Sequence, residues 1–135
     1  MDYVLPEDSQ FEEFLQSGGT GEPVVLCHLL KFRERANYSN HPSAEPCSGR
    51  DAYNRYLNQA TKYIELHGGV VLYRGKVASV LIGPESESWD EVLLVQFPSV
   101  ETVTEMMGSD YYQAIGHHRL AGLKDTRLLT LSPGL

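Results

Sequence analysis

The residues best suited to chemistry in this sequence are two histidines and two tyrosines, His28, Tyr38, Tyr53 and His118. His28 stands in an otherwise apolar segment, VVLCHLLKF. Burial among apolar neighbours lowers the pKa of a histidine, so a neutral imidazole at this position can act as a base near pH 7. A buried histidine that only satisfies one hydrogen bond gives the same pattern, and the sequence does not separate the two interpretations.

Tyr38 lies in a long polar segment, residues 33–48, shortly after Arg33 and Arg35. An arginine guanidinium can hold a carboxylate or enolate through two hydrogen bonds, and a tyrosine hydroxyl can donate to a developing oxyanion. We therefore predict that Arg33 and Arg35 bind an acidic group and that Tyr38 stabilises negative charge. The alternative is a solvated run of charges in a loop that is held by ordinary hydrogen bonds.

Further candidates lie on helical patterns. Tyr53 and Tyr56 fall on the apolar stripe of residues 48–67, and such a stripe usually packs in the core. Their hydroxyls need partners when buried, so Tyr53 can also donate to an oxyanion and Tyr56 can contact a ligand. His118 shares a helix face with Tyr111, which makes His118 a second candidate for the base and Tyr111 a candidate ligand contact.

Trp89 precedes an apolar strand pattern, where it can line an apolar ligand cavity, anchor a hairpin or contact a second subunit.

We predict no metal site, because the side chains of the adjacent His117 and His118 point about 100° apart on a helix and no local motif adds further metal ligands. We expect no cofactor, since the chain has no GxGxxG, GxxxxGK[ST], HExxH or GxSxG motif. Haem bound through an axial histidine is the remaining alternative.

The segments that must position these side chains can be read from periodicity and breaker residues. Apolar runs predict strands, three- and four-residue spacing predicts helices, and glycine, proline and serine mark the ends. Residues 1–22 form an N-terminal helical extension and residues 23–135 form one domain. We predict strands at residues 24–32, 70–82, 89–97 and 126–131, and helices at residues 7–17, 48–67, 100–107 and 110–122.

From residue 23 onward the order of elements is βαββαβ, which is typical of the ferredoxin-like α+β fold with a four-stranded antiparallel sheet. Helices cover one face of such a sheet and leave the other face open to a partner or a ligand. We expect the long segment 33–48 to fold over this open face. Ser48, Ser99 and Asp110 are the expected N-caps of helices, and Gly75 predicts a bulge in a strand.

Composition argues against several classes of function. The formal net charge of −7 and the scattered cations argue against nucleic-acid binding. No run approaches the ~18 apolar residues of a membrane span, and the acidic N-terminus lacks the features of a secretory signal. We therefore expect a cytoplasmic protein without a membrane partner, in which Cys27 and Cys47 are free thiols rather than a disulfide.

Five separated runs carry a family resemblance: LLKFRERANY, SGRDAYNRY, HGGVVLYRGKV, WDEVLLVQFPS and DYYQAIGHHRLAGLKDTRLL. Over about residues 24–133 the chain resembles the uncharacterised "domain of unknown function 1330" family, within the dimeric α/β-barrel superfamily. The resemblance implies a ferredoxin-like fold, a homodimer whose two sheets form a barrel, and a site between sheet and helices. It implies no established reaction. Family members often have Asn where this chain has His28.

These observations favour a small homodimeric protein that binds a small organic molecule, such as an aromatic or carbonyl compound. If the protein is an enzyme, we expect a cofactor-independent isomerase, cyclase or lyase that uses His/Tyr acid–base chemistry. His28 would be the base, with His118 as the second candidate, while Tyr38 and Tyr53 would donate to an oxyanion. The alternative function is a non-catalytic dimeric binding or assembly module.

Overall fold

The computed structural model describes residues 2–132, which form four helices and one four-stranded sheet. The positions of these elements follow the sequence pattern closely at most boundaries. In chain order they are α1 (Asp8–Gln16), β1 (Val24–Phe32), α2 (Gly49–Leu66), β2 (Val70–Lys76), β3 (Glu91–Phe97), α3 (Val100–Gly108), α4 (Asp110–Gly122) and β4 (Leu123–Leu131).

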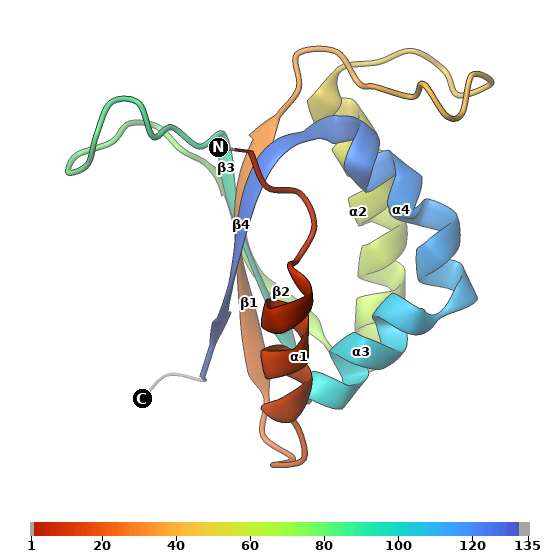
Figure 1. Cartoon of the computed structure of the whole chain (residues 1–135), viewed down its shortest axis with the longest axis vertical. Helices are drawn as coiled ribbons and strands as arrows, with labels where there is room; N and C mark the ends of the chain where they lie inside the picture. The colour runs from red at the N-terminus through yellow and green to blue at the C-terminus, as the bar shows by residue number, and fades with distance from the viewer. Residues whose placement is uncertain (1, 133–135) are drawn as a thin grey trace.

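The sheet has the strand order β2-β3-β1-β4, and each neighbouring pair is antiparallel. This is the arrangement of a ferredoxin-like unit, so the predicted α+β class and βαββαβ order are confirmed. The helices lie on one side of the sheet (Figure 1), and within residues 2–132 no element covers the other side. We call this uncovered side the open face.

The core lies between the sheet and α2. Side chains alternate along β3, so Leu93, Val95 and Phe97 point toward the helices and are buried. The apolar stripe predicted on α2 meets them, with Tyr53 and Leu57 among its buried residues. Burying one large apolar side chain contributes about 1.5–3 kcal/mol, so this layer holds the helices on the sheet.

Serine side chains cap three helices. Ser48 and Ser99 accept hydrogen bonds from the first turns of α2 and α3, as predicted. The prediction of Asp110 as an N-cap is wrong, because the Tyr112 N–H donates to Ser109 Oγ (3.1 Å). Ser109 has the extended backbone of an N-cap, and Asp110 lies inside the first turn, where its charge is favourable near the helix N-terminus.

The strand predicted at residues 70–82 is shorter in the structure, since β2 ends at Lys76. Residues 77–90 form an arm between β2 and β3, closed at its base by a hydrogen bond from the Val77 N–H to the Asp90 carbonyl (2.9 Å). The residues beyond Lys76 keep the apolar composition of a strand but pair with no neighbouring strand. Composition alone does not show where pairing ends.

Other strand details also differ from the prediction. The register shift in β2 lies between Val71 and Tyr73 and not at Gly75. At Gly75 an added Cβ would stand 2.2 Å from the hydroxyl of Tyr73, so the glycine leaves room for that ring. β3 begins at Glu91, two residues later than predicted, and β4 begins at Leu123, three residues earlier.

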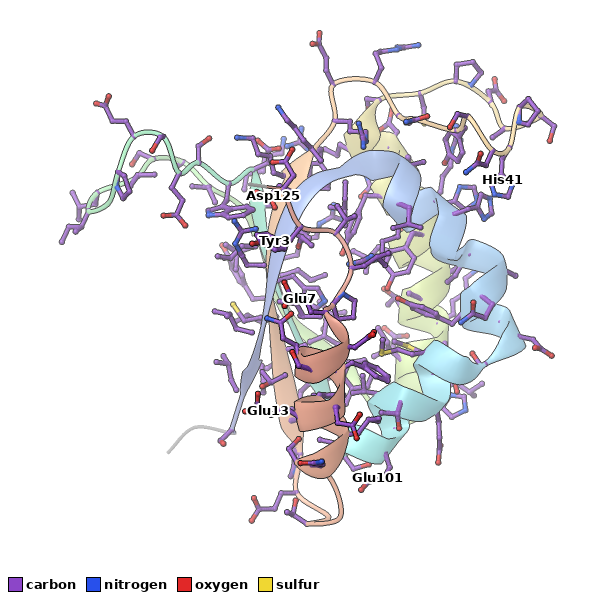
Figure 2. All side chains as sticks on the ribbon, viewed as in Figure 1. Tyr3, Glu7, Glu13, His41, Glu101 and Asp125 are labelled. Carbon is purple, nitrogen blue, oxygen red and sulfur yellow. The ribbon has the colours of Figure 1, made fainter. Side chains whose placement is uncertain are left out.

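The N-terminal segment crosses from the edge of β4 to α1, as Figures 1 and 2 show. The Tyr3 N–H donates to Asp125 Oδ1 (2.7 Å), and the Thr126 N–H donates to the Tyr3 carbonyl (2.8 Å). On the helix side, Arg119 Nη1 donates to the Val4 carbonyl (2.9 Å). The extension is therefore hydrogen-bonded to both layers of the domain.

Candidate active site

Tyr38 and His118 are in direct contact, although 80 positions separate them in the sequence. Tyr38 Oη lies 2.6 Å from His118 Nδ1. Arg55 of α2 completes the group, because its Nη1 donates to Tyr38 Oη (3.4 Å) and its guanidinium lies 5.7 Å from the centre of the Tyr38 ring. Since arginine can only donate, the Tyr38 oxygen accepts from Arg55 and its own O–H is directed at Nδ1 of a neutral His118.

The loop of residues 33–48 brings Tyr38 to this position. Its two ends are held together at the junction of α2 and α4, where the Arg33 N–H donates to the Gly122 carbonyl (2.8 Å) and the Gly49 N–H donates to the Arg33 carbonyl (3.1 Å). The prediction that the loop folds over the open face is therefore wrong. It lies over the ends of α2 and α4, on the helix side of the sheet (Figure 1).

Three imidazoles lie together, His41 from the loop and His117 and His118 from α4. The ring centre of His117 is 4.3 Å from that of His41 and 4.0 Å from that of His118. Burial lowers the pKa of His118, and the charges of His117, Arg55 and His41 lower it further. Burial raises the pKa of Tyr38, and the hydrogen bond from Arg55 opposes this effect. At neutral pH the pair therefore consists of a tyrosine O–H and a neutral imidazole.

Tyr53 and Tyr56 are buried in the core, and His28 is half-buried on the helix side of β1; all three lie apart from the Tyr38 group. The His28 Nδ1–H donates to the Leu93 carbonyl on the neighbouring strand (3.1 Å). The rings of Tyr53 and Tyr56 are 5.4 Å apart, and burial raises the pKa of both hydroxyls. The predicted catalytic residues thus form one contacting pair, Tyr38 with His118, and a separate set in the core.

The environment of His28 predicts acid sensitivity. Burial lowers the pKa of His28 to about 4, whereas an unfolded histidine titrates near about 6.5. Between these values the unfolded chain binds the proton more readily, so stability is retained above pH 6.5 and falls as the pH drops toward 4. We expect this residue to reduce the free energy of unfolding by about 2–3 kcal/mol between pH 7 and pH 4.

Urea unfolding at several pH values tests this expectation. His28→Asn should remove the part of the loss in unfolding free energy at acidic pH that His28 causes. His67→Gln, which alters an exposed histidine at the end of α2, should show the same loss as the wild type. Identical pH dependence in the wild type and in His28→Asn would contradict the assignment. The comparison uses differences between proteins, so carboxylates that titrate in the same range cancel.

The remaining predicted ligand-binding residues are dispersed. Arg33 lines a cavity at the start of α2, and Arg35 is exposed where it bridges to the residue before α2. Trp89 lies at the base of the arm, where it lines a second cavity of about 200 Å³. Tyr111 donates to the main-chain carbonyl of Gln59 on α2 (2.8 Å). The polar and ring contacts of the Tyr38–His118 pair are instead with Arg55 and His117.

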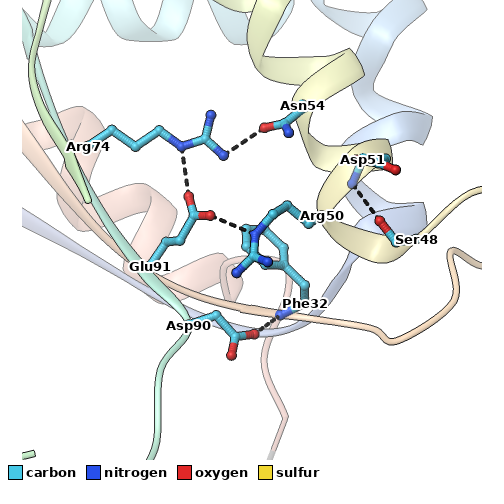
Figure 3. A network of polar contacts seen from close by, with 8 residues as sticks. All are labelled: Phe32, Ser48, Arg50, Asp51, Asn54, Arg74, Asp90 and Glu91. Carbon is cyan, nitrogen blue, oxygen red and sulfur yellow. Dashed lines mark hydrogen bonds and ion pairs between the residues drawn. The ribbon is translucent and has the colours of Figure 1, made fainter. Parts of the chain in front are cut away.

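A second polar group, which the sequence analysis missed, joins the sheet to α2 (Figure 3). Glu91 is buried and accepts from Arg50 Nε (2.8 Å) and Arg74 Nε (2.7 Å), and Arg74 Nη2 also donates to Asn54 Oδ1 (2.6 Å). The Arg50 guanidinium lies 5.3 Å from the ring centre of Phe32, at the edge of the 380 Å³ cavity that Arg33 also lines. A buried carboxylate needs such partners, so this group fixes β2, β3 and α2 together.

Among residues 2–132, no three His, Cys, Asp or Glu side chains are placed to hold a metal ion. Cys27 and Cys47 are free thiols, in agreement with the prediction from the sequence. In the same part of the chain, no helix has the length and apolar character needed to cross a membrane.

A family model described as "Domain of unknown function (DUF1330)" matches residues 47–131, which is more than half of the chain. The chain belongs to the DUF1330 family. The resemblance noted in the sequence is thereby confirmed. No curated protein sequence matches the chain significantly.

Solved structures are similar to this DUF1330 protein at two levels of identity. A protein of unknown function from Rhodopseudomonas palustris is 30% identical, covers 100% of this chain and 99% of its own, and superposes with a TM-score of 0.90. A hydroxynitrile lyase from Passiflora edulis is 7% identical over 84% of this chain and 95% of its own, with a TM-score of 0.57. A ferredoxin-like DABB family protein from Mesorhizobium loti is 13% identical over 82% and 96%, with a TM-score of 0.51. The last two share the fold alone.

Proposed function

We propose that this DUF1330 protein binds a small carbonyl compound beside Tyr38 and transfers a proton on it without a cofactor, as an isomerase or lyase does. The observation that carries the proposal is the 2.6 Å contact between Tyr38 Oη and His118 Nδ1, with Arg55 bound to the same oxygen. A hydroxyl placed between a neutral base and a fixed cation is suited to exchange protons with a substrate.

The proposed step moves one proton between the substrate, Tyr38 and His118, and the protonated pair exchanges with solvent before a proton returns. Tyr38 Oη removes a proton from the carbon next to the substrate carbonyl, while its own proton passes to Nδ1 of His118. The electron pair of the broken C–H bond moves onto the carbonyl oxygen as an enolate, whose charge Arg55 stabilises. Because burial, and then the charges of His117, Arg55 and His41, lower the pKa of His118, the imidazolium formed is a ready acid and returns a proton through Tyr38.

We further propose that the protein acts as a homodimer joined through the open face. That face carries exposed apolar side chains from the two edge strands, with Val70 at 45% and Tyr73 at 57% on β2 and Leu129 at 50% on β4. The half-buried Leu94 of β3 and Cys27 of β1 lie between Tyr73 and Leu129 in the same row of the sheet. Exposed apolar surface on several adjacent strands is characteristic of an interaction site. The proposed catalytic group lies on the helix side, so dimerisation through the open face leaves it accessible.

A panel of small 2-oxo acids, 3-oxo acids and aryl ketones tests the proposed chemistry. A compound present at 100 times its dissociation constant should raise the melting temperature by about 5–10 °C. The same compound should lose its α-proton signal in D₂O, followed by proton NMR, faster than in buffer alone. Binding without exchange would instead favour the non-catalytic binding module, and neither binding nor exchange across the panel would contradict the proposal.

A further inference from the structure

The arm of residues 77–90 stands away from the rest of the fold. Figure 1 shows it projecting from one end of the sheet on the side opposite the helices, which is the side of the open face. At its base the Val77 N–H donates to the Asp90 carbonyl (2.9 Å) and the Asp90 N–H donates to the Leu30 carbonyl of β1 (2.7 Å), and farther out the Glu87 N–H donates to the Pro84 carbonyl in a turn (3.1 Å). Between these points the backbone pairs with no other described segment.

Three consecutive residues shortly before this turn are apolar. Val80, Leu81 and Ile82 follow one another, and their exposed fractions are 47%, 95% and 93%. Water-exposed apolar surface costs about 25 cal/mol per Å² relative to burial, so three such residues in succession favour a covering partner. The core of the same subunit lies on the other side of the sheet, so it cannot cover these three side chains.

The exposed area of the whole chain also exceeds that of a self-contained monomer. The chain exposes 8626 Å² and has a mass of 15.1 kDa. Folded monomers of this mass expose roughly 7,100 Å², which leaves an excess of roughly 1,500 Å². A standard interface removes about 800 Å² from each partner, so the excess is large enough for both the open face and an arm.

We propose that the arm clasps a second copy of this chain, with Leu81 and Ile82 packing on the partner subunit while the two open faces meet. A second copy is the occupant that fits, because a two-fold axis gives each subunit one arm to extend and one surface to receive it. The arm and the open face point the same way, so one partner covers both. This inference rests on the homodimer proposed above and adds the element that secures it.

Analytical ultracentrifugation over a dilution series tests the clasp. The double variant L81S/I82S changes two fully exposed side chains, so the fold of the subunit should be unaffected. It should raise the dimer dissociation constant by about 100-fold or more, since four apolar side chains per dimer lose their cover. Leu66→Ser is the matched control, because Leu66 is 82% exposed on α2 and lies on the helix side.

The outcomes separate the clasp from the dimer itself. Weakening by L81S/I82S, with Leu66→Ser unchanged, supports the clasp. If the wild type is a dimer and L81S/I82S has the same dissociation constant, the clasp is overturned, while the proposed dimer through the open face is retained. A wild type that is monomeric throughout would overturn both, while the chemistry proposed at Tyr38 would remain open to its own assay. Equal weakening by both variants would also overturn the clasp.

Discussion

Gly49→Ala is expected to lower the free energy of unfolding by at least about 3 kcal/mol, even though alanine favours helices more than glycine does. A Cβ at Gly49 would stand 2.1 Å from the Arg33 carbonyl oxygen and 2.8 Å from the Gly122 carbonyl oxygen. Both are main-chain atoms, so no side-chain rotation can relieve the overlap. Either α2 separates from α4 or the base of the loop that carries Tyr38 opens.

Gly116→Ala on α4 is the matched control. No atom lies within 4 Å of a Cβ at Gly116, and its backbone is helical, so alanine should raise the free energy of unfolding by about 0.5–1 kcal/mol. Urea unfolding followed by circular dichroism measures both changes. Equal stabilities of the two variants would show that the close contact between α2 and α4 is not maintained in solution.

The fold was predictable because each element bears a local signal. The run VVLCHLLKF predicted residues 24–32 as a strand, and β1 has those bounds. Ser48 and the Gly68–Gly69 pair bracket α2, and Gly68 adopts the left-handed conformation that favours glycine after a helix, with φ of +86°. These signals depend on nearby residues alone, so the sequence contains them directly.

The ends of β2, β3 and β4 were less predictable, because a strand continues only while a neighbour pairs with it. Residues 77–82 have strand-like composition, yet they extend past the end of β3 and become part of the arm. No property of the residues themselves marks that point. Pairing is a property of the whole sheet, and local pattern therefore overestimates the length of β2.

The site was predictable only in part. Tyr38 and His118 were each identified from local features. Their contact could not be predicted in that way, because they are 80 positions apart in the sequence and only the fold brings them together. Arg55 was missed because it lies on the outer side of α2, where a charged residue ordinarily faces solvent. Glu91 was missed as well, although a carboxylate at an inward position of an alternating strand is a usable signal.

Tyr38→Phe is expected to slow α-proton exchange by about 10²–10⁴-fold on the best substrate of the carbonyl panel, the range that positioned acid–base groups contribute. The substitution removes only the hydroxyl that contacts His118 and Arg55. Tyr63→Phe is the control, since Tyr63 stacks on His67 in the last turn of α2 and its substitution should leave the rate unchanged. Exchange rates by NMR, measured at saturating substrate, give the comparison.

His118→Gln should reduce the rate by a similar factor, because glutamine keeps a polar group beside Tyr38 but cannot take up the proton. The lowered pKa of His118 also fixes the direction of the pH profile: the neutral base persists below pH 6.5, and activity is lost only as the pH falls through that lowered value.

His28→Asn distinguishes the two predicted bases. If it abolishes exchange while Tyr38→Phe and His118→Gln retain it, the base is His28 and the substrate must reach the core between sheet and helices.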